Sequence, residues 1–219
     1  MVIATGISTN AFAANKFVGG QANYNPSSTD PGVTSIYTDI YTPSYPNVFE
    51  SSFSCTWPMI VDSNTDKYVQ VGWMKINYPN YKQGTYYFFE EGSSTNGTYN
   101  REFAGVGPDQ YTTHGYRVFM ENGNWKGSVD GAQIGTVRTK TWKGAGIQYY
   151  EEIAGSDPYK AAFAGTSSTH AKFSSLRTYY NNNTIYTPAL SFYVDPGAGK
   201  LDNSKYNSSG YFDAWDARY

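Results

Sequence analysis

The sequence has little of what disulfides, metal sites and nucleic-acid interfaces need. A single cysteine, Cys55, excludes an intrachain disulfide and any zinc site built from several cysteines. The two histidines, His114 and His170, lack HExxH or a similar spacing, so we expect no metal site and no cofactor. Charged residues make up 16% of the chain, the formal net charge is -2, and Lys and Arg form no cluster. We therefore expect neither nucleic acid nor a membrane surface as a partner.

Long apolar runs are missing as well, so the sequence predicts no transmembrane helix. Residues 1–14 read MVIATGISTNAFAA, and the small residues on either side of Phe12 suit a signal-peptide cleavage site, although the usual basic start is missing. We expect residues 1–14 to be the remnant of a secretory signal, with a polar N-terminal arm as the alternative. Residues 15–219 are then expected to form one secreted, monomeric domain.

Aromatic residues and glycine are abundant. The chain has 22 Tyr, 22 Gly and 18% aromatic residues, a composition typical of many strands joined by tight turns. A length of 219 residues suits a single all-β domain with a substantial core. We predict an antiparallel two-sheet β-sandwich of the jelly-roll or concanavalin-like kind.

Strand-like segments recur at short, regular spacing between turn residues. The expected strands are 16–24, 33–42, 49–61, 67–77, 84–91, 115–121, 125–129, 132–138, 146–153, 169–179, 184–194 and 209–217. Asn122-Gly123 and Asp130-Gly131 supply the positive-φ residues of two-residue hairpin turns, so 115–138 predicts a three-stranded meander. Two long loops are expected, at 92–107 and at 154–169.

Two of the expected strands carry a carboxylate on a polar face, because side chains alternate between the two faces of a strand. In the strand 146–153, the polar face holds Gln148, Tyr150 and Glu152, and the apolar face holds Ile147, Tyr149, Glu151 and Ile153. In 49–57, the polar face holds Glu50, Ser52, Ser54 and Thr56, and the apolar face holds Phe49, Phe53, Cys55 and Trp57. If both polar faces line one cleft, Glu50 and Glu152 become a carboxylate pair.

Such a pair can perform general acid-base catalysis. Two carboxyl groups in one cleft share a proton, since ionising both costs Coulomb repulsion. The ionised member can take a proton from water while the protonated member hydrogen-bonds the carbonyl or the leaving group. This chemistry serves the hydrolysis of peptide or glycosidic bonds. The alternative is that both glutamates are ordinary exposed strand residues.

The order of features over residues 32–73, GVTSIYTDIYTPSYPNVFESSFSCTWPMIVDSNTDKYVQVGW, resembles the neprosin family of glutamic peptidases. The family shows a Pro-bearing connection, a Glu before a Ser-patterned strand ending in Trp, and then a strand like Gln-Val-Gly-Trp. The segments TYYFFEEG (85–92) and QYYEEI (148–153) resemble the family's aromatic strand and its second Glu-bearing strand. The similarity spans roughly residues 17–180 and favours the shorter bacterial relatives, without the propeptide and disulfide cysteines of plant members.

Carried over by position, the resemblance implies that Glu50 and Glu152 are the catalytic glutamates. It also implies cleavage of peptide bonds at acidic pH without a metal, with a preference for proline before the scissile bond.

Further residues are candidates for substrate binding. Gln70 shares a strand face with Tyr68 and could orient water or the substrate carbonyl. Gln148 and Tyr150 share the face of Glu152 and could bind the peptide backbone. Glu90 and Glu91 are expected to be solvated strand ends. Glu151 is expected to turn sideways from the apolar face towards a Lys or Arg.

The sequence therefore predicts a secreted, metal-independent glutamic endopeptidase that acts on peptides or proteins. A non-catalytic carbohydrate-binding sandwich, which would use Tyr and Trp as stacking platforms, is the alternative. A glycosidase that uses the same carboxylates is the third reading.

Overall fold

The protein is described by a computed structural model that covers residues 13–24, 32–62, 66–93, 98–136, 142–155, 157, 160–180, 184–186 and 188–219. Residues 1–12 of the expected signal remnant lie outside this range, so the secretory origin of the segment stays a prediction. No helix in these ranges is both long enough and apolar enough to cross a membrane.

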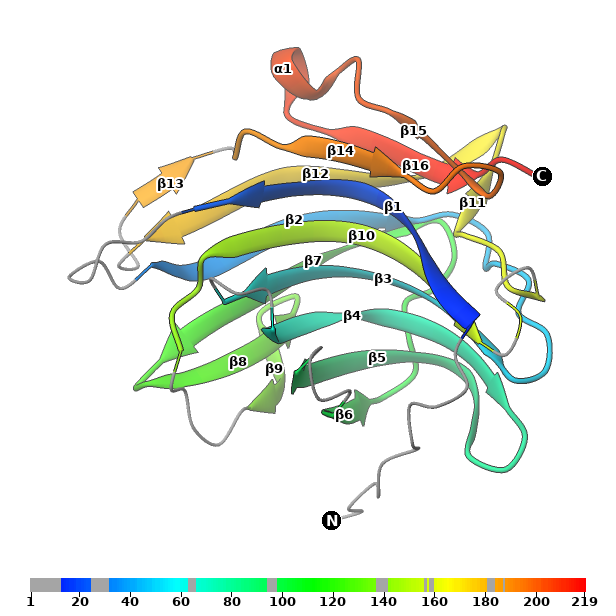
Figure 1. Ribbon diagram of the computed structural model, residues 1–219, viewed down its shortest axis with the longest axis horizontal. Coiled ribbons are helices and arrows are strands. Elements are labelled where there is room, and N and C mark those ends of the chain that lie inside the picture. The colour runs from blue at the N-terminus through cyan, green and yellow to red at the C-terminus, as the bar shows by residue number, and fades with distance from the viewer. Residues whose placement is uncertain are drawn as a thin grey trace.

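Two antiparallel sheets stacked face to face form the molecule, which confirms the predicted β-sandwich (Figure 1). One sheet has seven strands. Their order across the sheet is β14 (Ser191–Val194), β1 (Ala13–Asn23), β10 (Gly146–Gly155), β3 (Ser52–Val61), β4 (Lys67–Tyr78), β5 (Lys82–Ser93) and β6 (Thr98–Ala104).

The second sheet has nine strands, of which seven form its main path. The order of that path is β15 (Gly199–Asp202), β16 (Phe212–Asp216), β12 (Thr169–Tyr180), β2 (Val33–Thr42), β7 (Thr112–Glu121), β8 (Asn124–Val129) and β9 (Ala132–Thr136). The short strands β11 (Gly165–Thr166) and β13 (Thr184–Tyr186) pair with β12, and one helical turn, α1 (Tyr206–Ser209), precedes β16.

The main core lies between the sheets. On β4, Val69, Val71 and Trp73 point into it and are fully buried, while Gln70 on the alternate face does not belong to it. Trp125 of β8 contributes from the other sheet. At about 25 cal/mol per Å² of apolar surface removed from water, this layer is the main favourable term in folding.

A second apolar cluster lies on the outer face of the seven-stranded sheet. Its buried members are Phe53, Cys55, Trp57, Met74, Ile76, Phe88, Tyr150 and Ala154. The face assignment expected for β3 is therefore wrong: its Phe, Cys and Trp side chains face outward, and the alternate residues Ser54 and Thr56 are buried towards the second sheet. Hydrophobic alternation shows which residues share a face but not which face meets the core, because here both faces are covered.

Both predicted hairpin turns are present. Asn122 and Gly123 have φ of 52° and 76°, and Asp130 and Gly131 have φ of 50° and 81°. These left-handed conformations match the right-handed twist of the flanking strands. They join β7, β8 and β9 into the expected meander.

The expected loops are shorter than predicted. The segment 92–107 contains β6, which completes the sheet beside β5. In 154–169, β10 continues to Gly155 and β11 pairs with the start of β12. The expected strand 184–194 is divided into β13 and β14, which belong to different sheets. The segment 98–104 has the polar composition of a loop, but an edge strand needs only one apolar face.

Candidate active site

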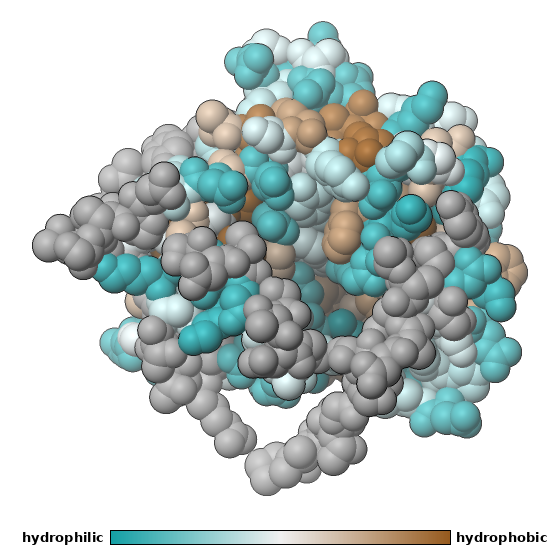
Figure 2. Space-filling model, in the orientation of Figure 1, coloured by the Kyte–Doolittle hydropathy of each residue, from teal (hydrophilic) through white to brown (hydrophobic). Residues whose placement is uncertain are grey.

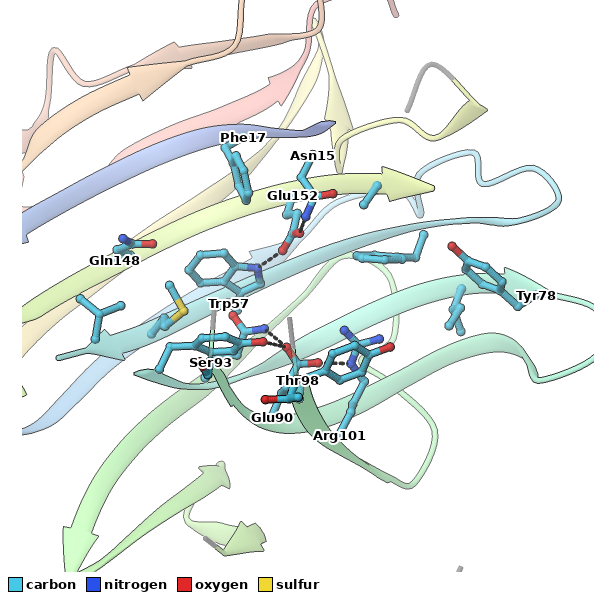
Figure 3. Close-up of a pocket in the computed structure, with 18 of the residues that line it drawn as sticks. Asn15, Phe17, Trp57, Tyr78, Glu90, Ser93, Thr98, Arg101, Gln148 and Glu152 are labelled. Carbon is cyan, nitrogen blue, oxygen red and sulfur yellow. Dashed lines mark hydrogen bonds and ion pairs between the residues drawn. The ribbon is translucent and has the colours of Figure 1, made fainter. Parts of the chain in front are cut away.

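A cavity of about 340 Å³ lies on the outer face of the seven-stranded sheet. Its walls come from β1, β3, β4, β5, β6 and β10, so it crosses most of that sheet. Figure 2 shows this side of the molecule, where hydrophobic residues gather in its upper part and hydrophilic residues surround them. Two glutamates line the cavity, Glu152 and Glu90 (Figure 3).

Glu152 is held by donors from two neighbouring strands. Asn15 Nδ2 of β1 donates to Oε1 at 2.6 Å, and Trp57 Nε1 of β3 donates to Oε2 at 3.1 Å. Cys55 Sγ, which lies opposite Glu152 in the β3–β10 register, adds a weak contact to Oε2 at 3.6 Å. Figure 3 shows Asn15 and Trp57 directed at the carboxyl group. These contacts fix the carboxyl group at the wall of the cavity.

The pKa of Glu152 is raised to about 7. Burial is the main cause, because only 8% of the residue is exposed and a charged carboxylate loses hydration there. The negative charge of Glu90 raises the pKa further, whereas the hydrogen bond from Trp57 and the charge of Arg101 lower it. Glu152 can therefore change its protonation state near neutral pH.

Glu90 lies in the same cavity and makes three polar contacts. Its Oε1 accepts hydrogen bonds from Tyr68 Oη at 2.8 Å and from Gln70 Nε2 at 3.0 Å, and its Oε2 accepts one from Arg101 Nε. The register of the sheet explains this grouping, because Gln70 of β4, Glu90 of β5 and Arg101 of β6 lie opposite one another. Glu90 itself is 3% exposed.

Arg101 is enclosed by aromatic rings and by the Sδ atom of Met74. Its guanidinium carbon lies 5.0 Å from the ring centre of Tyr99, 5.5 Å from that of Phe53 and 5.7 Å from that of Phe88. Burial is the largest single influence on the pKa of Arg101 and acts to lower it, but the charge of Glu90, the smaller contributions of Tyr99 and Cys55 and the hydrogen bond to Glu90 together outweigh burial, and the pKa lies above its ordinary value. The Glu90–Arg101 ion pair is therefore a fixed part of the cavity wall.

The structure brings three of the five predicted site residues to the cavity, Gln70, Gln148 and Glu152. Tyr150 shares the face of Glu152 but packs beside the cavity, with its ring centre 5.6 Å from that of Trp57 and its hydroxyl donating to Gln21 at 3.1 Å. Glu50 is exposed in the turn before β3 and does not line the cavity. The expected pairing of Glu50 with Glu152 is wrong. β3 begins only at Ser52, and Cys55, not the even-numbered face of that strand, lies beside Glu152.

Glu90 was missed because Glu at the end of an expected strand was assigned to solvent. In the structure β5 continues to Ser93 and β6, which lies within the expected loop 92–107, covers Glu90. One signal was available: Phe88 and Glu90 alternate with Phe89, so Glu90 shares the face of Phe88, which belongs to the outer cluster.

Glu151 faces the opposite way, as strand alternation predicted. It is fully buried between the sheets, and neither carboxyl oxygen makes a hydrogen bond of ordinary geometry within the described part of the chain. The expected escape towards a Lys or Arg is therefore wrong. Burial raises the pKa of Glu151 well above its usual value, the Ala164 amide offsets this in part, and the carboxylate of Asp216 adds to the rise.

We expect the substitution Glu151→Gln to stabilise the protein increasingly as pH rises. Below the pKa of a Glu side chain in the unfolded chain, about 4.3, the carboxyl group is protonated in both the folded and the unfolded state, and stability is at its full value. Above that pH the unfolded chain ionises while the buried group holds its proton, so the free energy of unfolding falls as pH rises. The free energy of unfolding falls by about 1.4 kcal/mol per pH unit for one proton. Gln is neutral at every pH, so the variant does not show this loss. Urea unfolding between pH 4 and 8 measures the difference. Wild type and variant should agree near pH 4, and a constant difference across the range would contradict the assignment.

The cavity holds the parts needed for hydrolysis by acid-base catalysis. Glu152 can exchange a proton near neutral pH, and Gln70 offers an amide group whose Nε2 has one further N–H beyond that bonded to Glu90. Within the described ranges, no three His, Cys, Asp or Glu side chains are grouped so that they could hold a metal ion.

The sequence matches no family model and no curated protein. Among solved structures, the chain is similar to scytalido-glutamic peptidase with a transition state analog inhibitor, at 10% identity and a TM-score of 0.65, over 93% of this chain and 98% of that one. It is also similar to SCP-B, a member of the Eqolisin family of peptidases in a complex with the tripeptide Ala-Ile-His, at 9% identity and a TM-score of 0.59, over the same shares. These likenesses show that the chain has the fold of those glutamic peptidases.

Proposed function

We propose that the protein is a glutamic peptidase that hydrolyses peptide bonds at the cavity of Glu152 and Gln70. The observation that carries the proposal is a buried carboxyl group with a pKa of about 7 in a cavity that also presents a carboxamide. A titrating group buried in a cleft is a candidate catalytic acid or base. The shared fold with glutamic peptidases supports the same reading.

In the proposed reaction, the ionised Glu152 takes a proton from a water molecule, whose oxygen bonds to the carbonyl carbon of the scissile peptide. The carbonyl oxygen becomes an oxyanion, and the remaining N–H of Gln70 donates a hydrogen bond to it. Protonated Glu152 then gives its proton to the leaving nitrogen as the C–N bond breaks. Glu152 is regenerated as a carboxylate, so one group serves as base and then as acid.

The walls of the cavity favour a peptide with apolar side chains. Phe53, Ile76, Tyr78 and Tyr81 line it from β3, β4 and the β4–β5 turn, and the guanidinium of Arg101, which also lines it, is already paired with Glu90. We also propose a preference for proline before the scissile bond and a closer kinship with the neprosin family. Both rest on the resemblance of residues 32–73 to that family. Export from the cell is proposed on the same resemblance and on the small residues near Phe12.

The purified protein should cleave a denatured protein with a rate that depends on pH through Glu152. Because the carboxylate starts the reaction, kcat/KM should rise about tenfold per pH unit below 7 and level off above it. The measurement is kcat/KM for one quenched fluorescent peptide from pH 3 to 9. Activity confined to acid, as the resemblance implies, would show instead that Glu152 works in its protonated form.

The same preparation separates the alternatives. A peptidase gives new peptide termini, whose sequences also report the residue before the cleaved bond. Saturable binding to a polysaccharide without turnover would identify a carbohydrate-binding module, and release of reducing sugar would identify a glycosidase.

A further inference from the structure

We propose that Glu90, held in place by Arg101, is a positioning residue that fixes the carboxamide of Gln70 and keeps a negative charge beside Glu152. The inference rests on the proposed function, since it assigns a task to Glu90 in the same reaction. Glu90 does not contact the reacting atoms in this scheme and acts through its neighbours.

The orientation of Gln70 follows from the hydrogen-bonding capacity of Glu90. A carboxylate only accepts hydrogen bonds, so the nitrogen of the Gln70 carboxamide must turn towards it, as the 3.0 Å contact from Nε2 shows. A carboxamide at position 90 could form a hydrogen bond with either the nitrogen or the oxygen of the Gln70 side chain. Glu90 therefore selects one of two carboxamide orientations, and only that orientation keeps Nε2 beside the ion pair.

Arg101 makes this arrangement rigid. Its Nε donates to Oε2 of Glu90 while Tyr68 and Gln70 occupy Oε1, so both carboxyl oxygens are restrained from different strands. Around the guanidinium, the rings of Phe53, Phe88 and Tyr99 leave it little freedom to turn. Groups that orient metal ligands in this way typically contribute about 10- to 100-fold in activity, and we expect an effect of the same order on the carboxamide of Gln70.

The charge of Glu90 also acts on Glu152 across the cavity. The titratable and charged groups that influence Glu152 are Cys55 of β3, Tyr68 of β4, Glu90 of β5 and Arg101 of β6. Of these, Glu90 raises the pKa of Glu152 and Arg101 lowers it. Removing Glu90 alone should therefore lower the pH at which Glu152 titrates, both by losing a negative charge and by leaving Arg101 unneutralised.

Two variants separate orientation from charge. In Glu90→Gln we expect kcat to fall about 10- to 100-fold with KM within about threefold, and the midpoint of the rising limb of kcat/KM to move to lower pH. In the double variant Glu90→Gln with Arg101→Met, both charges are gone. The midpoint should then return towards that of the wild type. The loss in kcat should remain, because the Gln70 carboxamide can still adopt either of its two orientations.

Glu102→Gln is the matched control, because Glu102 is the exposed neighbour of Arg101 on β6. It removes the same charge at nearly the same place and should change neither kcat nor the midpoint. Thermal melting of each variant shows whether it is folded at the assay temperature. The double variant leaves no unpaired buried charge, so it keeps the test valid if Glu90→Gln alone unfolds.

Titration of Glu152 by carboxyl-carbon NMR gives a readout that needs no turnover. If the wild type cleaves no peptide but the Glu152 midpoint still moves in Glu90→Gln, the proposed function fails and the charge coupling stands. If the wild type is an active peptidase and Glu90→Gln has unchanged kcat and an unchanged Glu152 midpoint, the positioning role of Glu90 is overturned.

Discussion

Replacing Glu152 with Gln should lower kcat for peptide hydrolysis by about 10³- to 10⁴-fold, because in the proposed reaction one side chain supplies both the base and the acid. The substitution is nearly isosteric, and Trp57 and Cys55 can still donate to a Gln oxygen. Asn15 can turn its own carboxamide to accept from the new amide. We therefore expect a folded protein, and a normal melting curve together with lost turnover would identify a chemical role.

Glu50→Gln is the informative comparison for this experiment. The resemblance assigned Glu50 to the reaction, but its position in an exposed turn outside the cavity predicts that the variant keeps nearly all of its activity. Both variants should be assayed on one peptide across the pH range. Activity that survives in Glu152→Gln and disappears in Glu50→Gln would contradict the site described above.

Trp57→Ala should destabilise the protein by about 3 to 5 kcal/mol and also impair catalysis. Trp57 is 2% exposed and packs against Tyr150, so truncation leaves a large void in the outer cluster. It also removes the indole N–H that donates to Glu152. Urea unfolding at constant pH measures the change in the free energy of unfolding.

Trp57→Phe separates the two effects, since it keeps most of the apolar volume and loses the donor. The Trp57 hydrogen bond lowers the pKa of Glu152, so its loss should move the rising limb of kcat/KM to higher pH. Stability should fall by much less than in Trp57→Ala. A limb that stays in place in Trp57→Phe would show that the 3.1 Å contact has no influence on the ionisation of Glu152.

The sequence was sufficient for the fold class and for the direction in which several side chains point. Strand alternation correctly separated Glu152 from Glu151 and Gln70 from Val69 and Val71, because the period of two leaves no other choice once a strand is identified. The two hairpins were predicted because Asn-Gly and Asp-Gly have backbone preferences of their own. These features depend on local properties of the chain.

The second glutamate of the cavity, Glu90, could not be found in the same way. Glu90 reaches the cavity only because β4, β5 and β6 are paired in one register, and β6 has a polar composition typical of a loop. The faces of β3 were reversed for a related reason. Its Phe, Cys and Trp residues cover an outer cavity, which alternation cannot distinguish from the space between two sheets.

The contacts in the cavity differ widely in their separation along the chain, and this bears on when activity arises during folding. Gln70 and Glu90 are 20 residues apart and Glu90 and Arg101 are 11 apart, so we expect the neighbouring hairpins to assemble that side early. Glu152 is 95 residues from Trp57 and 137 from Asn15. We expect those long-range pairings to form late. With the proposed function, a nascent or partly folded chain would then lack a complete site and would not cleave the unfolded copies around it.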